Sequence, residues 1–531
     1  MKLNLNALEN TNFWHERAVA LPKFDVVKVR ENTVKQPRWV HFGAGNIFRM
    51  FLGSIADTLL EKGEARTGIN CVESFDFDII DKIYKPHDNL ALGVTLLSDG
   101  NKEKKIIGSL SEALTVRDKD RLKEIFTADS LQMVSFTITE KGYALKNSEG
   151  NYFPYIQKEL ESCPESASSA MGMITAMLLE RYKKNALPLA VVSMDNCSHN
   201  GEKLKNAVLD IAENWVKNGF CGEEFLNYLE DEAKISFPWT MIDKITPRPS
   251  ETIAEELEKD GIEGMTPIVT SKNTYIAPFV NAEKPQYLVI EDKFPAGRPH
   301  FEAAGVYMTD RETVNKSERM KVTTCLNPLH TALAVLGCLL GYKSIADEMK
   351  DEDLRALVRK IGIDEGLPVV TDPKILSPKD FVNEVINVRL PNPFVPDTPQ
   401  RIATDTSQKV GIRFGETIKA YQAKYGTAES LDAIAFAIAS WCRYLMAVDD
   451  NGENFELSAD PMMNELKEIL GGITLGEEYH GELKPLLSNA NIFGINLYKA
   501  KIGEKIEKLF EEEINGKGAV RKTLKAIVTK Q

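Results

Sequence analysis

The chain has 531 residues, 43% hydrophobic and 27% charged, which is enough apolar sequence to bury the cores of about two to four domains. Its net charge of −13 would repel a phosphate backbone, so we expect no nucleic-acid partner. The 7 cysteines are scattered without a C-x-x-C pair. This pattern argues against a disulfide framework and a thiolate zinc site, and it favours a cytoplasmic location.

The amino-terminal residues contain no apolar stretch of the roughly 7–15 residues that a secretory signal needs. The longest apolar stretch, residues 329–342, is shorter than the roughly 20 residues of a membrane crossing and predicts a buried helix. We therefore expect a soluble protein with no membrane partner.

Strands and helices are predicted to alternate in the first half of the chain. Residues 38–42 (RWVHF) predict a strand, GAGN at 43–46 a turn, and the apolar period from Ile47 to Leu60 a helix. Further buried parallel strands are expected at 69–74, 131–139 and 189–194, with a helix at 168–185. This alternation predicts the α/β class, with a doubly wound sheet of the Rossmann type.

The second half changes character after a short strand at 287–292 and a turn-rich segment at 294–300. From about Lys316 the periodicity is mostly helical, for example at residues 331–342, 343–362, 428–448 and 504–513. We therefore predict a Rossmann-type dinucleotide-binding domain over residues 1–290 and a mostly α-helical substrate domain over residues 291–531.

The glycine-rich turn is the first candidate binding site. Gly43 and Gly45 permit backbone angles and close approaches that a side chain forbids, and the following helix would direct free N–H groups at a pyrophosphate. Phe48 stands where G-x-G-x-x-G has its third glycine, so the motif by itself also fits an ordinary tight turn. Because the turn joins a strand to a helix, we assign the cofactor to Gly43, Ala44, Gly45, Asn46, Ile47 and Phe48.

Two acids follow the next predicted strand. Glu73 and Asp76 stand where a carboxylate would accept hydrogen bonds from a ribose diol and would repel a 2′-phosphate. The alternative is that one or both merely face solvent in a loop. With no basic cluster next to Glu73 in the sequence, we expect NAD as the cofactor.

A polar segment follows the predicted strand at 189–194. It brings Asp195, Asn196, His199 and Asn200 to the carboxyl end of a strand, where open α/β sheets bind ligands. The alternative is that some of these residues cap the next helix.

Residues 320–337 bring Lys321, Asn327 and His330 to the start of a strongly apolar helix. Partial burial lowers a lysine pKa, which suits a group that transfers protons near neutral pH. The alternative is that Lys321 extends to water and His330 is a hydrogen-bonded core residue.

Seven segments, in this order, resemble the polyol-specific long-chain dehydrogenases, the mannitol dehydrogenase family. The similarity spans most of the chain, and its marks are FGAGNIFR (42–49), TITEKGY (137–143), SMDNCSHNG (193–201), MIDKITPRP (241–249), YLVIEDKFPAGRP (287–299), residues 321–330 and residues 390–409. The resemblance implies a Rossmann domain, a helical domain, an active site between them, and hydride transfer with a nicotinamide cofactor.

The resemblance also implies residue roles. Lys321 matches the catalytic acid/base, Asn196 and Asn327 the pair that holds the reacting oxygen, and His330 a substrate-orienting group. Asp243 and Glu318 match acids near the lysine and its proton path, Arg401 and Lys409 match the basic pair at the far end of the substrate, and we assign Thr139 and Glu140 to the cofactor. We expect no metal, since neither H-E-x-x-H nor clustered histidines occur in the sequence.

One departure from the family concerns spacing. Family members usually have four residues between the lysine and the asparagine, whereas VTTCL places five between Lys321 and Asn327. An extra residue rotates a regular helix by about 100°. Either a one-residue π-bulge next to Pro328 absorbs it, or Asn327 is an N-cap with Pro328 at the first helical position.

The substrate is expected to be a sugar acid or a polyol. Arg401 and Lys409, with Arg389 and Arg413 nearby in sequence, favour a carboxylate. The resemblance to the family then implies the D-fructuronate and D-mannonate pair, with D-tagaturonate or mannitol as alternatives. A non-enzyme alternative is an NAD-binding sensor or scaffold.

Overall fold

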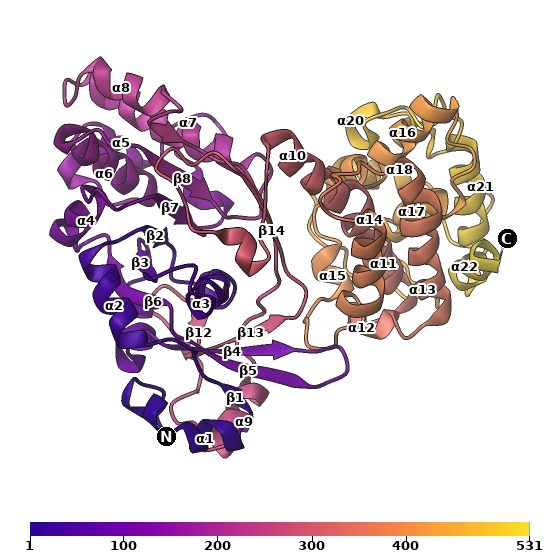
Figure 1. Cartoon of the computed structure of the whole chain (residues 1–531). Coiled ribbons are helices and arrows are strands. Elements are labelled where there is room, and N and C mark those ends of the chain that lie inside the picture. Colours follow the sequence, from indigo (N-terminus) through magenta and orange to yellow (C-terminus); the bar gives the residue numbers. More distant parts are fainter. Residues whose placement is uncertain (530–531) are drawn as a thin grey trace. The chain divides into compact units, whose positions relative to one another are not determined.

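The computed structural model describes residues 1–529, and its backbone contacts divide the chain into two compact units (Figure 1). The first unit comprises residues 1–97 and 101–315, and the second residues 98–100 and 316–531. The sequence placed the boundary at 290/291. The chain stays with the first unit beyond that point because β14 (Tyr287–Glu291) pairs with both β10 (Thr240–Asp243) and β15 (Tyr307–Thr309).

The first unit is built on a six-stranded parallel sheet in the order β6-β3-β2-β7-β8-β9. This is the strand order of a doubly wound dinucleotide-binding sheet, so the predicted fold class is confirmed. The order reverses between the neighbours β2 and β7, and such sheets bind ligands outside the carboxyl ends of these strands. The strands are β2 (Trp39–Phe42), β3 (Ile69–Glu73), β6 (Leu110–Thr115), β7 (Met133–Phe136), β8 (Leu189–Ser193) and β9 (Ile235–Ser236).

Successive residues of these strands enter two different cores, because side chains alternate across a strand. Val40 and Phe42 belong to one hydrophobic cluster, whereas Trp39 belongs to the other. The sheet is therefore covered on both faces, as its continuous apolar strands predict. The helices of this unit are α1 (Thr11–Glu16), α2 (Val26–Lys35), α3 (Gly53–Glu61), α4 (Lys119–Phe126), α5 (Pro154–Leu160), α6 (Ala170–Lys184), α7 (Asn200–Lys217), α8 (Glu223–Glu230) and α9 (Glu251–Lys259).

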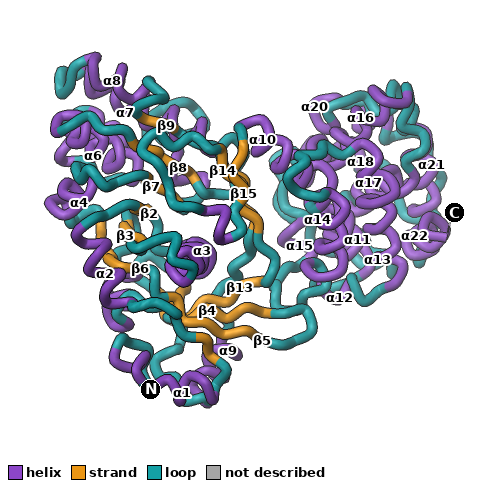
Figure 2. The backbone as a smooth tube through the Cα atoms, in the orientation of Figure 1, coloured by secondary structure: helices purple, strands orange, loops and turns teal. Residues whose placement is uncertain are grey.

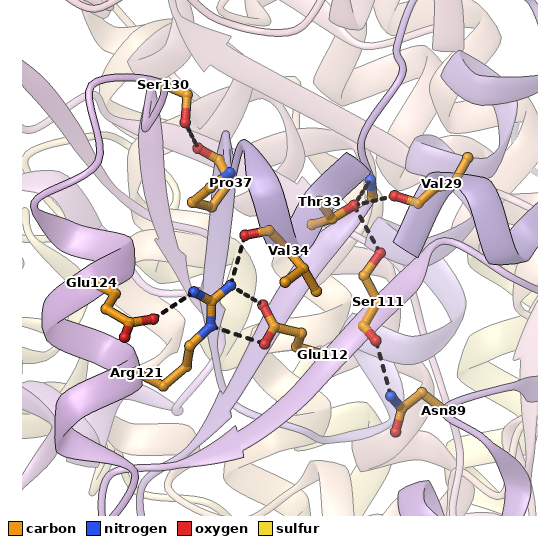
Figure 3. Close-up of polar contacts among 11 residues, drawn as sticks. Val29, Thr33, Val34, Pro37, Asn89, Ser111, Glu112, Arg121, Glu124 and Ser130 are labelled. Atoms are coloured by element: carbon orange, nitrogen blue, oxygen red, sulfur yellow. Dashed lines mark hydrogen bonds and ion pairs between the residues drawn. The ribbon is translucent and has the colours of Figure 1, made fainter. Parts of the chain in front are cut away.

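Polar contacts hold α2 against the edge of this sheet (Figure 3). The Thr33 hydroxyl receives a hydrogen bond of 3.0 Å from Ser111 Oγ on β6. Arg121 of α4 donates to the carbonyl of Val34 at 3.0 Å and forms a two-pronged ion pair with Glu112. The helix that precedes β2 is thereby tied to β6 and α4.

A second, four-stranded sheet has the order β1-β5-β4-β13, and a hairpin joins β11 to β12. Its strands are β1 (Val19–Ala20), β4 (Ala91–Leu96), β5 (Lys102–Ile107) and β13 (Phe279–Glu283), and the hairpin comprises β11 (Ile268–Val269) and β12 (Tyr275–Ile276).

The second unit is helical, and in Figure 2 it is drawn in the purple of helices and the teal of loops, whereas the first unit also carries orange strands. The helical periodicity at 343–362 is confirmed but interrupted, because one helix ends at Glu348 and Asp351 caps the next through the backbone N–H groups of Asp353 and Leu354. The helices of the second unit that follow α10 (Arg311–Met320) are α11 (Asn327–Leu340), α12 (Ile345–Glu348), α13 (Glu352–Arg359), α14 (Pro378–Glu384), α15 (Pro399–Ile402), α16 (Glu416–Tyr425), α17 (Asp432–Tyr444), α18 (Met463–Leu470), α19 (Lys484–Leu487), α20 (Ala490–Phe493), α21 (Gly503–Ile514) and α22 (Ala519–Thr529).

One helical stretch, Arg311–Leu340, is long and apolar enough to cross a membrane by composition. Its most apolar window is 78% buried inside the protein, as in the core helix of a soluble protein. The predicted buried helix at 329–342 is confirmed as part of α11.

Candidate active site

The glycine turn follows β2 at the point where the strand order reverses. Gly43 has a φ of +110°, and a Cβ atom there would lie 2.2 Å from the carbonyl oxygen of Thr137, so only glycine fits. A Cβ on Gly45 would meet nothing within 4 Å. The fold itself therefore requires glycine at the first position and leaves open space at the second.

Phe48 stands in place of the third glycine of the motif, and its side chain packs in the core. The Phe48 ring is buried and stacks on His41 with 4.2 Å between ring centroids. The helix begins as a π-helical turn over Phe48–Leu52 before continuing as α3. At Gly53 the following helix packs closely on β5 of the second sheet, because a Cβ there would lie 2.8 Å from Ile107.

The two acids after β3 are buried, so the expectation that they might simply face solvent is wrong. Glu73 Oε2 accepts the N–H of Ala44 at 3.0 Å, and Oε1 accepts the N–H groups of Phe75 and Asp76 at 2.8 and 3.2 Å. Asp76 accepts the hydroxyl of Thr270 through Oδ2, whereas its buried Oδ1 has no hydrogen-bond partner within residues 1–529. Glu73 thus holds the glycine turn, and Asp76 keeps a free acceptor.

A cavity of about 680 Å³ opens beside the end of β3. Ser74, Phe75, Arg117 and Lys272 are among its lining residues. The Arg117 guanidinium lies 4.1 Å from the ring centroid of Phe77, and the Lys272 ammonium 5.2 Å from that of Phe75. The sequence showed no basic cluster next to Glu73, but the fold brings these cations to the same cavity from distant segments.

A second cavity, of about 840 Å³, lies at the opposite end of the sheet. Its lining includes Arg38 and Gln132, which precede β2 and β7. It is therefore remote from the glycine turn, which follows the carboxyl end of β2.

The polar segment after β8 is mainly a structural clamp. Asp195 accepts the N–H groups of Ile138 and Thr139 at 2.9 Å each and the Tyr143 hydroxyl at 2.6 Å. Burial raises the Asp195 pKa, and these three donors oppose that shift. Thr139 has a φ of +64°, so Asp195 holds the loop after β7 in a strained conformation.

Its neighbours differ in exposure and contacts. Asn200 is buried and binds the backbone and hydroxyl of Thr240 at 2.9–3.0 Å, and His199 stacks on Trp239. The His199 side chain stands at the N-cap position of α7 and makes no capping hydrogen bond. Asn196 is exposed at the carboxyl end of β8, and Glu140, after β7, pairs with Lys203.

A π-helical turn begins at Lys321. The N–H of Leu326 donates to the carbonyl of Lys321 at 3.1 Å, five residues back, and the π turn spans Lys321–Cys325. Leu326 is the N-cap of α11 and Asn327 is its first residue, so the N-cap alternative is wrong and the π-bulge alternative is confirmed. The bulge absorbs the residue that lengthens the spacing to Asn327.

Lys321 is 3% exposed, so the alternative in which this side chain extends to water is wrong. Glu318 lies half-buried one turn earlier on α10. Asp243 is buried at the end of β10 in the first unit. Asn327 is partly exposed at the start of the same helix as His330.

The charges of four cations act on His330 in the second unit. Burial, followed by the charges of Arg413, Arg401, Arg389 and Lys409, lowers the His330 pKa to about 3, so the ring is neutral. The sequence grouped these four cations at one end of the substrate, and in the structure the charges of all four act on one imidazole. Arg413 donates to the Thr331 hydroxyl, and burial lowers the Arg413 pKa to about 10.

Sequence reasoning missed Asp397. Its Oδ2 lies 3.2 Å from His330 Nε2, and its Oδ1 pairs with Arg401. The i, i+4 spacing of Asp397 and Arg401 was the available signal. The contact of Asp397 with His330 could not be predicted, because Asp397 lies in the loop before α15 and His330 lies on α11.

Comparisons with known proteins decide the family. The Mannitol dehydrogenase Rossmann domain matches residues 37–303, and the Mannitol dehydrogenase C-terminal domain matches residues 313–512. The chain belongs to the mannitol dehydrogenase family. The resemblance stated from the sequence motifs is thereby confirmed, and the chain is an oxidoreductase of this family.

Members of the mannitol dehydrogenase family align with nearly the whole chain. The chain is 54% identical to the D-mannonate oxidoreductase of Thermotoga maritima over the full length of both proteins. It is 29% identical to the D-mannonate oxidoreductase of Escherichia coli, over 90% of this chain and 92% of that protein. The structure of Pseudomonas fluorescens mannitol 2-dehydrogenase with NAD and D-mannitol superposes with a TM-score of 0.71 at 26% identity, covering 100% of each chain.

Proposed function

We propose that this oxidoreductase interconverts D-fructuronate and D-mannonate with NADH and NAD. The cation cluster around His330 carries the substrate assignment, because four positive side chains suit a substrate that bears a carboxylate. The name of the Thermotoga maritima relative supports the same choice. We place the protein in the cytoplasm on the strength of its cysteine usage.

The turn at Gly43–Phe48 would hold the cofactor. The open space at Gly45 suits a close approach of the pyrophosphate, and the strained Gly43 sets the turn. We assign the ribose hydroxyls to the two acids at the end of β3, Glu73 and Asp76, of which Glu73 also holds the turn by accepting three backbone N–H groups. Thr139 and Glu140 after β7 would flank the nicotinamide end.

When bound, the nicotinamide supplies the hydride. The Lys321 ammonium donates a proton to the alkoxide that develops at the reduced carbon, and in the oxidation direction neutral Lys321 accepts it. The amide N–H groups of Asn196 and Asn327 stabilise the negative charge on that oxygen. An ammonium and two amides can do the work of a Lewis acid, so the proposed mechanism requires no metal.

The remaining groups bind substrate and exchange protons. Arg401 and Lys409 contact the substrate carboxylate, and neutral His330 orients a hydroxyl group. Glu318, one turn before Lys321, and Asp243 carry protons between the lysine and water. Burial, followed by the charge of Arg413, lowers the Lys409 pKa, so an added anion is electrostatically favoured beside it.

The test is NADH oxidation with D-fructuronate, D-tagaturonate and D-fructose under identical conditions. We expect the highest kcat/KM for D-fructuronate. Lys321→Met should lower kcat by about 10²- to 10⁴-fold while leaving NADH binding unchanged. Lys467→Met, at an exposed position of α18 in the same unit, is the matched control.

Two results would contradict the proposal. Turnover of Lys321→Met within a few-fold of wild type would remove the acid/base assignment. Failure of every substrate, with NAD still raising the melting temperature, would favour the sensor alternative.

A further inference from the structure

Asp397 bridges two groups of the proposed substrate site. Its Oδ2 lies 3.2 Å from His330 Nε2, and its Oδ1 pairs with the Arg401 guanidinium. The side chain is only 14% exposed. Its backbone is anchored, because its N–H donates to the carbonyl of Val395 at 2.8 Å and its carbonyl accepts the N–H of Ile345 at 3.0 Å. The carboxylate therefore has little freedom to move away from the imidazole.

The neutral His330 ring carries a single N–H, on either Nδ1 or Nε2. A carboxylate accepts hydrogen bonds and does not donate them, so Asp397 stabilises the tautomer with the proton on Nε2. Within residues 1–529, Nε2 has no aligned hydrogen-bond partner, and the carboxylate contact is a close approach rather than an aligned bond. Contacts of this kind commonly align when a substrate binds.

We infer that Asp397 is a positioning residue that holds His330 in its Nε2–H tautomer, leaving Nδ1 to accept a hydrogen bond from a substrate hydroxyl. The same carboxylate holds Arg401 and offsets part of the repulsion among the four cations. This inference rests on the proposed function only in that His330 faces the substrate. The tautomer itself does not depend on which substrate is used.

Asp351 provides a structural comparison in the same unit. It is 12% exposed, its Oδ2 pairs with Arg521 at 2.7 Å, and it accepts the Tyr342 hydroxyl at 2.7 Å. Asp351 thus matches Asp397 in burial and in having an arginine partner. A carboxylate that only supports the fold should behave as Asp351 does when it is changed to an amide.

The first test is ¹⁵N NMR of protein labelled at histidine, with the His330 signals assigned by their loss in His330→Gln. In wild type at pH 7 we expect a protonated Nε2 and an unprotonated Nδ1. In Asp397→Asn the new amide can donate to Nε2, so the proton should move to Nδ1. Asp397→Glu, which keeps the carboxylate, should retain the wild-type tautomer, and Asp351→Asn should not alter it.

The second test separates binding from chemistry in the reaction of the intact enzyme. Asp397→Asn should lower kcat/KM for the keto acid by about 10- to 100-fold, mainly through KM, with the NADH dissociation constant unchanged. The loss of kcat/KM in Asp397→Glu should be smaller than in Asp397→Asn. Asp351→Asn should change the melting temperature without this KM effect.

The outcomes are distinguishable from those of the proposed function. A wild-type His330 protonated on Nδ1, or an Asp397→Asn variant with unchanged ¹⁵N shifts and unchanged KM, overturns the inference. If no keto acid is reduced but the tautomer switches as expected, the positioning of His330 stands and the proposed reaction falls. If Asp397→Asn does not fold, the wild-type and Asp397→Glu spectra still decide the tautomer.

Discussion

The carboxylate of Glu73 accepts a hydrogen bond of 3.0 Å from the backbone N–H of Ala44. This bond joins the end of β3 to the turn that follows β2. The other carboxylate oxygen accepts two N–H groups of the loop after β3, so one buried side chain holds both segments. The glycine turn is therefore shaped partly by an acid from a neighbouring strand.

Changing Glu73 to Gln should weaken NADH binding by about tenfold or more. One side of the amide would present N–H groups to a backbone N–H donor, and an unsatisfied buried donor costs about 1–3 kcal/mol. Fluorescence titration with NADH measures the change. An unaltered dissociation constant would mean that the hydrogen bonds of Glu73 do not affect the cofactor turn.

The two glycines of the turn should respond differently to alanine. Gly43→Ala places a Cβ 2.2 Å from the Thr137 carbonyl at a positive φ, so we expect a clear loss of melting temperature and of NADH binding. Gly45→Ala meets no protein atom within 4 Å, so it should fold normally and lose only NADH affinity. Calorimetry and cofactor titration of both variants check this, and a Gly45→Ala protein with normal affinity would contradict the assigned pyrophosphate position.

The π turn at Lys321 predicts an asymmetry between deletion and insertion. Deleting Val322 should convert the π turn to an α turn and leave the protein folded and active within about tenfold, because the turn holds one residue more than an α-helix needs. Inserting an alanine after Val322 should rotate α11 by about 100° and reduce kcat/KM by more than 100-fold. Equal activity of the two variants would show that the register of Asn327 does not matter.

Arg401 should distinguish acidic from neutral substrates. Arg401→Leu removes a cation that acts on the His330 site, so we expect KM for a keto-sugar acid to rise by about 10- to 100-fold. The KM for fructose should change only a few-fold, since this substrate has no carboxylate. A parallel loss for both substrates would assign Arg401 to structure instead of charge recognition.

Glu365 should make the second unit less stable at higher pH. Burial raises its pKa from the usual 4.5 to about 7, although it accepts the N–H groups of Ala433 and Ile434 at 2.7 and 2.8 Å. The folded state then binds more protons than the unfolded state, so stability falls as the pH rises from about 4.5 to about 7, by on the order of 3 kcal/mol.

Calorimetry from pH 4.5 to 8 measures this effect. Glu365→Gln should flatten the decline in melting temperature, whereas Glu429→Gln, at an exposed position, should not. Identical curves for wild type and Glu365→Gln would contradict the assignment.

Local sequence predicted four of the six strands of the parallel sheet and the glycine turn, and the spacing between Lys321 and Asn327 gave the π-bulge as one of two alternatives. These features depend on residues close together in the chain: continuous apolar runs, a glycine where no Cβ fits, and a proline that cannot donate a backbone hydrogen bond. The ordered motifs were also enough to indicate the family.

Only the tertiary structure showed that Glu73 turns inward to Ala44, that Arg117 and Lys272 share a cavity, and that Asp397 lies against His330. Each of these contacts joins side chains from separate segments. Their distances depend on how strands and helices pack, and local periodicity carries no information about that packing. The sequence alone therefore determined which chemical groups were available, and packing decided which of them act on one another.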